Sequence, residues 1–131
     1  MNITYKVNYP LNIEQAIDLY KRSTLGERRP VDKPDVFAKM LKNADLIITA
    51  WDNDKLVGIA RTLTDYGYVA YLADLAVDIE YQKKGIGKKL VEMTEENIDD
   101  TAHIVLLAAP AANEYYQKIG FTHNPRAWIK K

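Results

Sequence analysis

The sequence contains no cysteine and only two histidines, His103 and His123. Without cysteine the chain cannot use thiol catalysis, disulfide bonds or cysteine-based metal sites, and two distant histidines do not suggest a metal cluster. We therefore expect no bound metal. Long apolar runs are also missing, since no stretch approaches the roughly 18 consecutive apolar residues of a transmembrane helix. A role within a membrane is therefore not expected.

An excess of charge of one sign is absent as well. The 131 residues include 18 basic and 18 acidic side chains, so the net charge is zero. No overall field draws the protein to nucleic acid or to a membrane surface, and any anion site must be local. The polar N-terminus lacks the apolar core of a signal peptide, which favours a cytoplasmic location. The length predicts a single domain over residues 1–131.

Two familiar phosphate-binding motifs are missing too. There is no Gly-x-x-x-x-Gly-Lys-Ser/Thr run, and Gly-x-Gly-x-x-Gly is excluded because the third residue after Gly87 is Leu90. Instead, Gln-x-x-Gly-x-Gly stands between a β-branched, aromatic run and an amphipathic segment. Ile86, Leu90 and Met93 recur in that segment at helical spacing. The pattern predicts a strand, a short loop and a helix.

This junction has the physical properties of an anion site. The first N–H groups of a helix have no intrahelical partner and lie at the positive end of the helix dipole. Gly85 and Gly87 carry no Cβ, so a ligand can approach the backbone closely. A pyrophosphate would suit such a site, and a solvated turn with ordinary surface lysines is the alternative. The added positive charge comes from Lys83, Lys84, Lys88 and Lys89.

The rest of the chain alternates between strand and helix patterns. Helices are expected after the N-cap Asn12, after the N-cap Asp32, over residues 86–98, and from Pro110. The resulting order, β-α-α-β-β-β-α-β-α-β, predicts an α/β fold with a mixed α+β sheet and helices on both faces. Strands are expected over residues 2–8, 46–51, 56–63, 68–77, 104–108 and 121–129.

Two motifs carry a resemblance to a known family. Gln82-Lys83-Lys84-Gly85-Ile86-Gly87, after a strand ending in Leu75-Ala76-Val77, resembles the acetyl-CoA signature Arg/Gln-x-x-Gly-x-Gly/Ala of the GNAT superfamily of N-acetyltransferases. Tyr115-Tyr116-Gln117-Lys118-Ile119-Gly120-Phe121 is similar to that family's aromatic-Tyr-x-x-x-Gly-Phe element. The order of elements matches as well, and the likeness is closest to small single-domain bacterial members. One departure is Ala109, where many members carry an Asn that contacts coenzyme A.

The resemblance implies that acetyl-CoA fills a wedge between the strands at residues 68–77 and 104–108, which a bulge forces apart, so that the central sheet is splayed. Pantetheine would pair with the backbone of Leu75 and Val77 like an added strand. A backbone N–H near Val77 would polarise the thioester carbonyl. The expected cofactor-binding residues are Leu75, Ala76, Val77, Gln82, Lys83, Lys84, Gly85, Ile86, Gly87 and Lys88.

The reaction implied by the resemblance is direct transfer of an acetyl group to an amine. Tyr116 matches the family's general-acid tyrosine, with core packing as the alternative. For Tyr115, core packing is the favoured interpretation. Asp74 is the second catalytic candidate, because beside a bulge it could attract a cationic amine or take its proton through water. A structural role is the alternative for Asp74. Many relatives carry a Glu or His base where Tyr71 or Ala73 stands here, so a dedicated base is not assigned.

Three arginines are candidates for recognising the acceptor: Arg28, Arg29 and Arg61. The first two lie in the loop after the first helix, which borders the acceptor in this family, and an arginine fork suits a carboxylate. The leading hypothesis is therefore an N-acetyltransferase for a small-molecule amine or an amino acid. Acetylation of a protein lysine or N-terminus, and a non-catalytic acyl-CoA sensor, are the alternatives. The family resemblance also makes a homodimer possible.

Overall fold

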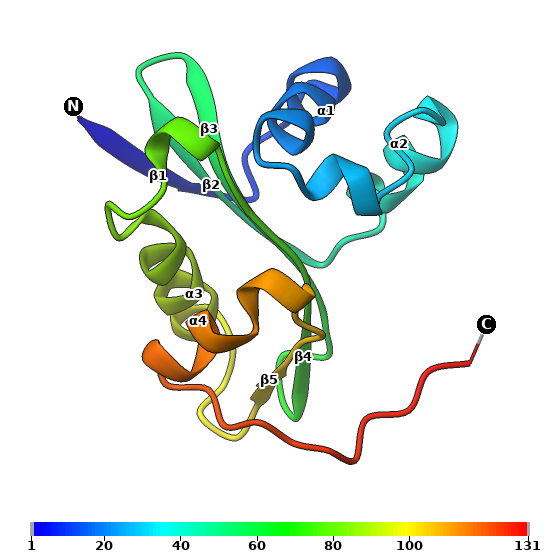
Figure 1. Cartoon of the computed structure of the whole chain (residues 1–131), viewed down its shortest axis with the longest axis vertical. Helices are drawn as coiled ribbons and strands as arrows, with labels where there is room; N and C mark the ends of the chain where they lie inside the picture. The colour runs from blue at the N-terminus through cyan, green and yellow to red at the C-terminus, as the bar shows by residue number, and fades with distance from the viewer. Residues whose placement is uncertain (1, 131) are drawn as a thin grey trace.

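The computed structural model describes residues 2–130 and forms one five-stranded sheet with helices on both faces (Figure 1). The strands lie side by side in chain order, and only the last pair is parallel. This arrangement confirms the predicted mixed α+β fold. The strands are β1 (Ile3–Val7), β2 (Leu46–Asp52), β3 (Lys55–Thr64), β4 (Val69–Val77) and β5 (His103–Val105). The helices are α1 (Ile13–Arg22), α2 (Pro34–Lys42), α3 (Ile86–Glu96) and α4 (Asn113–Lys118).

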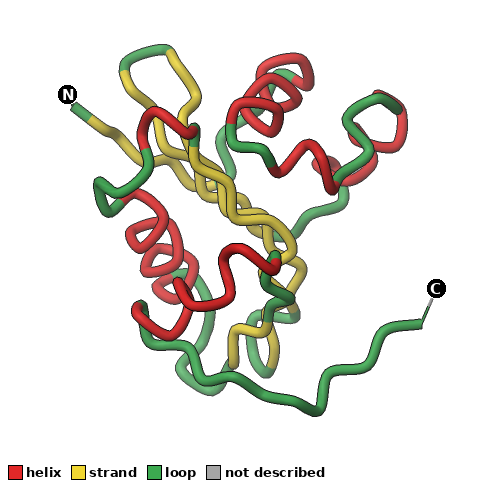
Figure 2. The backbone as a smooth tube through the Cα atoms, in the orientation of Figure 1, coloured by secondary structure: helices red, strands yellow, loops and turns green. Residues whose placement is uncertain are grey.

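Helices α1 and α2 cover one face of the sheet (Figure 2). Asn12 caps α1 as predicted, because its side chain accepts a hydrogen bond from the amide of Gln15 at 3.2 Å. Pro34 begins α2, where its missing N–H costs no helical bond, but the residue before it, Lys33, takes the N-cap position predicted for Asp32. The buried apolar residues of this layer are Ala16, Leu19, Tyr20, Phe37, Trp51, Leu56, Ile59 and Ala76.

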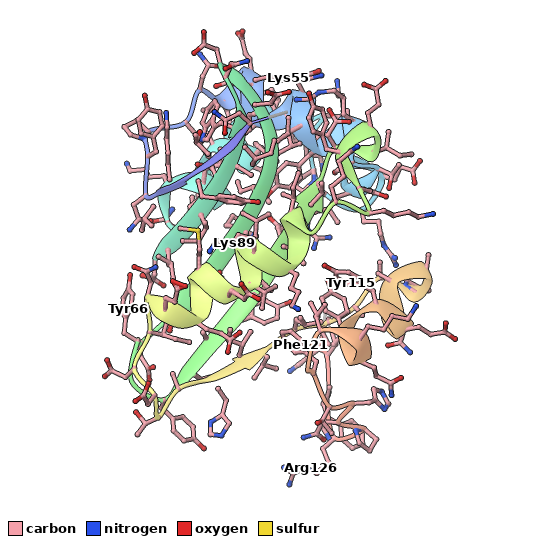
Figure 3. All side chains as sticks on the ribbon, turned by 90° about the vertical axis from the view of Figure 1, so that its left-hand side faces the viewer. Lys55, Tyr66, Lys89, Tyr115, Phe121 and Arg126 are labelled. Atoms are coloured by element: carbon pink, nitrogen blue, oxygen red, sulfur yellow. The ribbon has the colours of Figure 1, made fainter. Side chains whose placement is uncertain are left out.

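Helix α3 covers the opposite face. Its apolar stripe, which includes Ile86, Leu90 and Val91, packs on the sheet as the helical spacing predicts. Helix α4 lies beside α3 on the same side of the molecule (Figures 1 and 3). The other buried apolar residues of this layer are Leu46, Ile48, Ala50, Val57, Ala60 and Leu72.

Strand β4 contains the bulge that the family resemblance implied. Arg61 of β3 faces Asp74, whereas the next residue of β3 faces Leu72, so Ala73 is an extra residue without an opposite partner. The insertion reverses the alternation of side chains along the strand. Leu72 therefore packs in the α3 layer, whereas Asp74 lies with Ala76 toward α1 and α2.

The sheet is splayed beyond the bulge. Strands β4 and β5 pair only from Val69 opposite His103 to Tyr71 opposite Val105. Strand β5 ends there, so the strand predicted over residues 104–108 is wrong for residues 106–108. The part of β4 from Ala73 onward consequently has no strand partner on its β5 side among residues 2–130. This opening is the wedge that the resemblance implied.

The last predicted strand, over residues 121–129, is wrong. After α4 the chain continues as an extended tail that lies away from the sheet (Figure 1). Trp128 is 94% exposed and Ile129 66% exposed, so neither finds an apolar surface to pack on. Pro125 has no N–H to give to a ladder, and three-residue β5 offers only a short edge. No helix within residues 2–130 is both long and apolar enough to cross a membrane.

Candidate active site

The segment between β4 and α3 is shaped by local backbone conformation. Asp78 begins it, its carboxylate accepting from the amide of Glu80 at 2.9 Å and so starting one 3₁₀ turn. The Gln82 side chain then donates back to the carbonyl of Val77 at 3.1 Å. Gly85, at φ +83°, is the N-cap of α3, a left-handed conformation that glycine adopts without strain.

Backbone N–H groups in this segment are left without partners. No amide of residues 82–88 donates to another group in the described part of the chain, and the first helical bond runs from Lys89 to the carbonyl of Gly85 at 3.1 Å. A Cβ built on Gly85 would meet nothing within 4 Å. Lys83, Lys84 and Lys88 are exposed around these amides. Free donors, open space and positive charge fit a diphosphate group.

The segment is tied to the rest of the fold through Asp78. This carboxylate is buried and pairs with Arg22 of α1, while the Lys55 ammonium lies 3.8 Å away. Arg22 also donates to the carbonyl of Leu56 at 2.9 Å. The start of the loop is therefore held by charge-assisted bonds, which position the amides that follow. No pattern in the sequence indicates this pairing, because Arg22 and Asp78 are far apart along the chain.

The predicted strand residues lie at the wedge. The side chains of Leu75 and Val77 are half-buried against the α3 layer, whereas Ala76 is buried toward α1 and α2. The outer backbone edge of β4 is open at this level, where pantetheine was expected to pair. Side chains satisfy two nearby carbonyls, since Gln82 donates to Val77 and Arg29 donates to Ala73 at 2.8 Å.

Tyr115 and Tyr116 extend from the short helix α4. Their rings meet edge to face at 5.3 Å between centroids, and Tyr116 meets Phe121 in the same way at 5.5 Å. Tyr116 is half-buried in a groove that includes residues 106–108, which follow β5. Burial, and secondarily the neighbouring Tyr115, raises the pKa of Tyr116, so its hydroxyl keeps a proton at neutral pH. The hydroxyl is thus available as a donor.

On the opposite side of β4, Asp74 is the centre of a buried ionic cluster. One carboxylate oxygen accepts from Nε of Arg29 at 2.5 Å. The other accepts from Nε of Arg61 and from the Tyr20 hydroxyl, each at 2.5 Å. The Asp74 side chain has no exposed surface. The cluster joins α1, the loop after it, β3 and the bulge of β4 into one unit.

The cluster determines the protonation of its members. Burial by itself would raise the pKa of Asp74, but the hydrogen bond and charge of Arg61, the Tyr20 hydroxyl and the charge of Arg29 outweigh it, so this pKa is lowered. Burial and the adjacent carboxylate raise the pKa of Tyr20 well above its ordinary value. Asp74 is therefore ionised at neutral pH, and both of its oxygens already accept hydrogen bonds.

The structure thus brings some of the predicted site residues together and separates others. Arg29, Arg61 and Asp74 meet in one cluster, whereas Arg28 is exposed on the 3₁₀ turn at Leu25–Arg28. Asp74 does not line the groove that contains Tyr116. Tyr20 was not foreseen, because its helical spacing marks it only as a core residue.

Comparison with known proteins identifies this arrangement. Residues 24–127 match the family model for the acetyltransferase (GNAT) domain. The chain belongs to the GNAT family. Its members are acetyl-CoA-dependent N-acetyltransferases.

Individual relatives agree with this assignment. The uncharacterized N-acetyltransferase ycf52 of Pyropia yezoensis is 29% identical over 126 residues, which cover 88% of this chain and 71% of that protein. The histone acetyltransferase TAP1 of Glycine max is 28% identical over 127 residues, which cover 83% of this chain. The chain spans 54% of the length of TAP1.

Solved structures share the fold. A GNAT family acetyltransferase, SP0256 of Streptococcus pneumoniae, superposes with a TM-score of 0.79 at 24% identity, covering 99% of each chain. The aminoglycoside N-acetyltransferase AAC(6')-Iy in complex with CoA superposes with a TM-score of 0.73 at 16% identity, covering 99% of this chain and 94% of that one.

Proposed function

We propose that this protein transfers the acetyl group of acetyl-CoA directly to the primary amine of a small molecule or amino acid. The observation that carries the proposal is the run of free amides at residues 82–88, beside the open edge of β4. Acetyl-CoA needs both features, because its diphosphate takes N–H donors and its pantetheine takes an unpaired strand edge. The backbone of Leu75 and Val77 would hold the pantetheine.

Tyr116 would act as the general acid. The thiolate that leaves when acetyl is transferred needs a proton, and the Tyr116 hydroxyl is protonated at neutral pH. The attacking amine must lose a proton, which we assign to water in the wedge. A backbone N–H near Val77 would polarise the thioester carbonyl.

Asp74 would position the acceptor side without taking the proton itself. Its carboxylate holds Arg29, and Arg29 donates to the carbonyl of the bulge residue Ala73. The bulge and the loop after α1 are thereby locked together where the acceptor would approach. Arg61 is occupied by the same carboxylate and by the carbonyl of Met40 at 3.3 Å.

Among the three candidate arginines, Arg28 is the one best placed to bind an acceptor carboxylate. It is exposed, and its side chain donates to no group within residues 2–130, whereas Arg29 and Arg61 both pair with Asp74. A guanidinium fork binds a carboxylate with two parallel bonds. We therefore favour an acceptor that carries a carboxylate, such as an amino acid.

A screen of amines with acetyl-CoA, read out by release of free thiol, tests the proposal. Amino acids should be acetylated, and their carboxamides should react at least about tenfold more slowly, because Arg28 would lose its partner. Arg28→Gln should remove that difference. Lys42→Gln, at the exposed end of α2 and outside the groove that contains Tyr116, is the control of equal charge change. If acetyl-CoA binds but none of the amines in the screen causes thiol release, the result would contradict the proposed reaction.

Acetylation of a protein lysine is a second candidate. The relative TAP1 is named a histone acetyltransferase. In addition, Leu63, Tyr71 and Val105 lie opposite one another across β3, β4 and β5, and each is 37% to 47% exposed. Such an apolar row gives a peptide a surface to lie on. A lysine-containing histone-tail peptide belongs in the same screen, and turnover of it alone would favour this candidate.

A further inference from the structure

Tyr115 is in unusually close contact with the first turn of α3. Its ring lies in the gap between α4 and α3 (Figure 3). A Cβ built on Gly87 would stand 2.6 Å from the Tyr115 hydroxyl oxygen and 3.6 Å from the ring carbon that bears it. Real Cβ atoms essentially never approach a heavy atom to less than 3.0 Å. Only glycine therefore fits at residue 87 while Tyr115 occupies this position.

The Tyr115 hydroxyl lies among groups that would bind a diphosphate. Gly87 and its two neighbours in the first turn of α3 have free amides, and a methyl group of Val77, at the end of β4, is 3.8 Å from the same built Cβ. The hydroxyl donates to no group in the described part of the chain. Burial raises the pKa of Tyr115, so the hydroxyl keeps its proton at neutral pH.

We propose that Tyr115 is a cofactor-binding residue whose hydroxyl donates a hydrogen bond to the diphosphate of acetyl-CoA at the first turn of α3. This inference rests on the proposed function. It replaces the interpretation of Tyr115 as a packing residue and assigns different tasks to two adjacent tyrosines. Tyr115 binds the phosphates, whereas Tyr116 acts at the sulfur. Gly87 then leaves room for the Tyr115 hydroxyl as well as for the ligand.

Calorimetric titration of Tyr115→Phe tests the ligand contact. The substitution removes only the oxygen, and a hydrogen bond to a charged group is worth about a tenfold to hundredfold change in affinity. The dissociation constant of acetyl-CoA should rise by at least about tenfold. That of S-acetylpantetheine, which has no diphosphate, should stay the same. Tyr116→Phe is the matched control and should leave both dissociation constants unchanged.

Thermal unfolding of the protein without ligand tests the contact itself. Gly87→Ala should change the melting temperature less favourably than it does in a Tyr115→Phe background, because the new methyl group meets the Tyr115 hydroxyl and the tyrosine side chain must shift. In a Tyr115→Phe background the nearest ring carbon is 3.6 Å away, which is an ordinary contact, so Gly87→Ala should cost little more. The two substitutions should therefore be clearly non-additive.

Three outcomes would overturn the role of Tyr115. They are an unchanged acetyl-CoA affinity in Tyr115→Phe, an equal loss for acetyl-CoA and S-acetylpantetheine, and tighter binding of acetyl-CoA. The last would mean that the Tyr115 hydroxyl obstructs the cofactor site. Failure of the wild-type protein to bind acetyl-CoA is a separate result, and it would overturn the proposed function instead.

Discussion

The two sides of strand β4 hold their groups in different ways. On the α3 side, the candidate cofactor site consists of backbone amides whose directions depend on two glycines and the start of a helix. On the α1 side, Asp74 and its three partners are charged or hydroxylic side chains in a buried cluster. The first side has free donors, whereas the second has its donors and acceptors paired with one another.

This difference indicates a division of labour. Free N–H groups at an exposed helix start are stabilised by an incoming anion, so the α3 side is ready to bind a ligand. A buried carboxylate that already accepts three hydrogen bonds is stable only while each partner stays in place. The α1 side is therefore suited to holding the bulge and the loop after α1 in position. Substitutions on the two sides should have different consequences.

Tyr116→Phe should have the largest effect. General acid catalysis is typically worth about 10²- to 10⁴-fold, so kcat should fall by that amount. Acetyl-CoA affinity should not change, because Tyr116 lies in the groove beside residues 106–108 and not at the amides of residues 82–88. Stability should barely change, since the ring contacts with Tyr115 and Phe121 remain. Steady-state kinetics and calorimetric binding measure both quantities.

The pH dependence of kcat provides a check on this assignment. If the Tyr116 hydroxyl is the acid, kcat of the wild-type protein should decline at alkaline pH as the phenol ionises, and Tyr116→Phe should lack that decline. A Tyr116→Phe enzyme that runs at the wild-type rate would remove Tyr116 from the mechanism.

Gly85→Val should have the next largest effect, on binding. A branched side chain at the N-cap of α3 would occupy the space that a diphosphate needs, and acetyl-CoA affinity should fall by at least about a hundredfold, the value of two charge-assisted hydrogen bonds. The φ of +83° also makes valine strained at this position. Gly120→Val is a matched control, because Gly120 has a φ of +102° and a Cβ there would likewise meet nothing within 4 Å.

Both valine variants should lose similar stability, of order 1–2 kcal/mol, from the left-handed backbone. Only Gly85→Val should lose affinity for acetyl-CoA. Equal affinities for acetyl-CoA in the two folded variants would show that the loop before α3 is not the diphosphate site.

The comparison also explains what the sequence could predict. The strand, loop and helix on the α3 side were predictable because their features are local: Gly85 and Gly87 stand at a strand-to-helix junction, with lysines around them. The bulge at Ala73 was anticipated from the resemblance. The Asp74 cluster was not predictable, because Tyr20, Arg29 and Arg61 come from three separate elements that only the folded chain brings together. The predicted last strand failed because the residues of a segment do not by themselves show whether a neighbouring strand is long enough to pair with it.

The smallest expected effect is a change in the acid stability of the α1 side. The pKa of Asp74 is lowered in the folded state, so its ionised form contributes stability that is complete above the unfolded-state pKa of about 3.9. That contribution is lost as the pH falls from there through the folded-state pKa. Asp74→Asn has no ionisable group at this position, so its free energy of unfolding should decline less steeply over the same range.

Urea denaturation of both proteins between pH 6 and pH 2 measures the difference. The difference in free energy of unfolding between wild type and Asp74→Asn should be constant near neutral pH. It should narrow below about pH 4, because Asp74 is protonated there in the wild-type protein only. The other carboxylates titrate in both proteins, so their contributions cancel in this difference. Asp18→Asn is the control. The Asp18 carboxylate is 66% exposed in a surface pair with Arg22, so Asp18→Asn should lower the free energy of unfolding at neutral pH by less than about 1 kcal/mol. If this difference does not narrow in acid, the Asp74 carboxylate is not stabilised by its two arginines. The α1 side would then have no ionic cluster to contrast with the free amides of the α3 side.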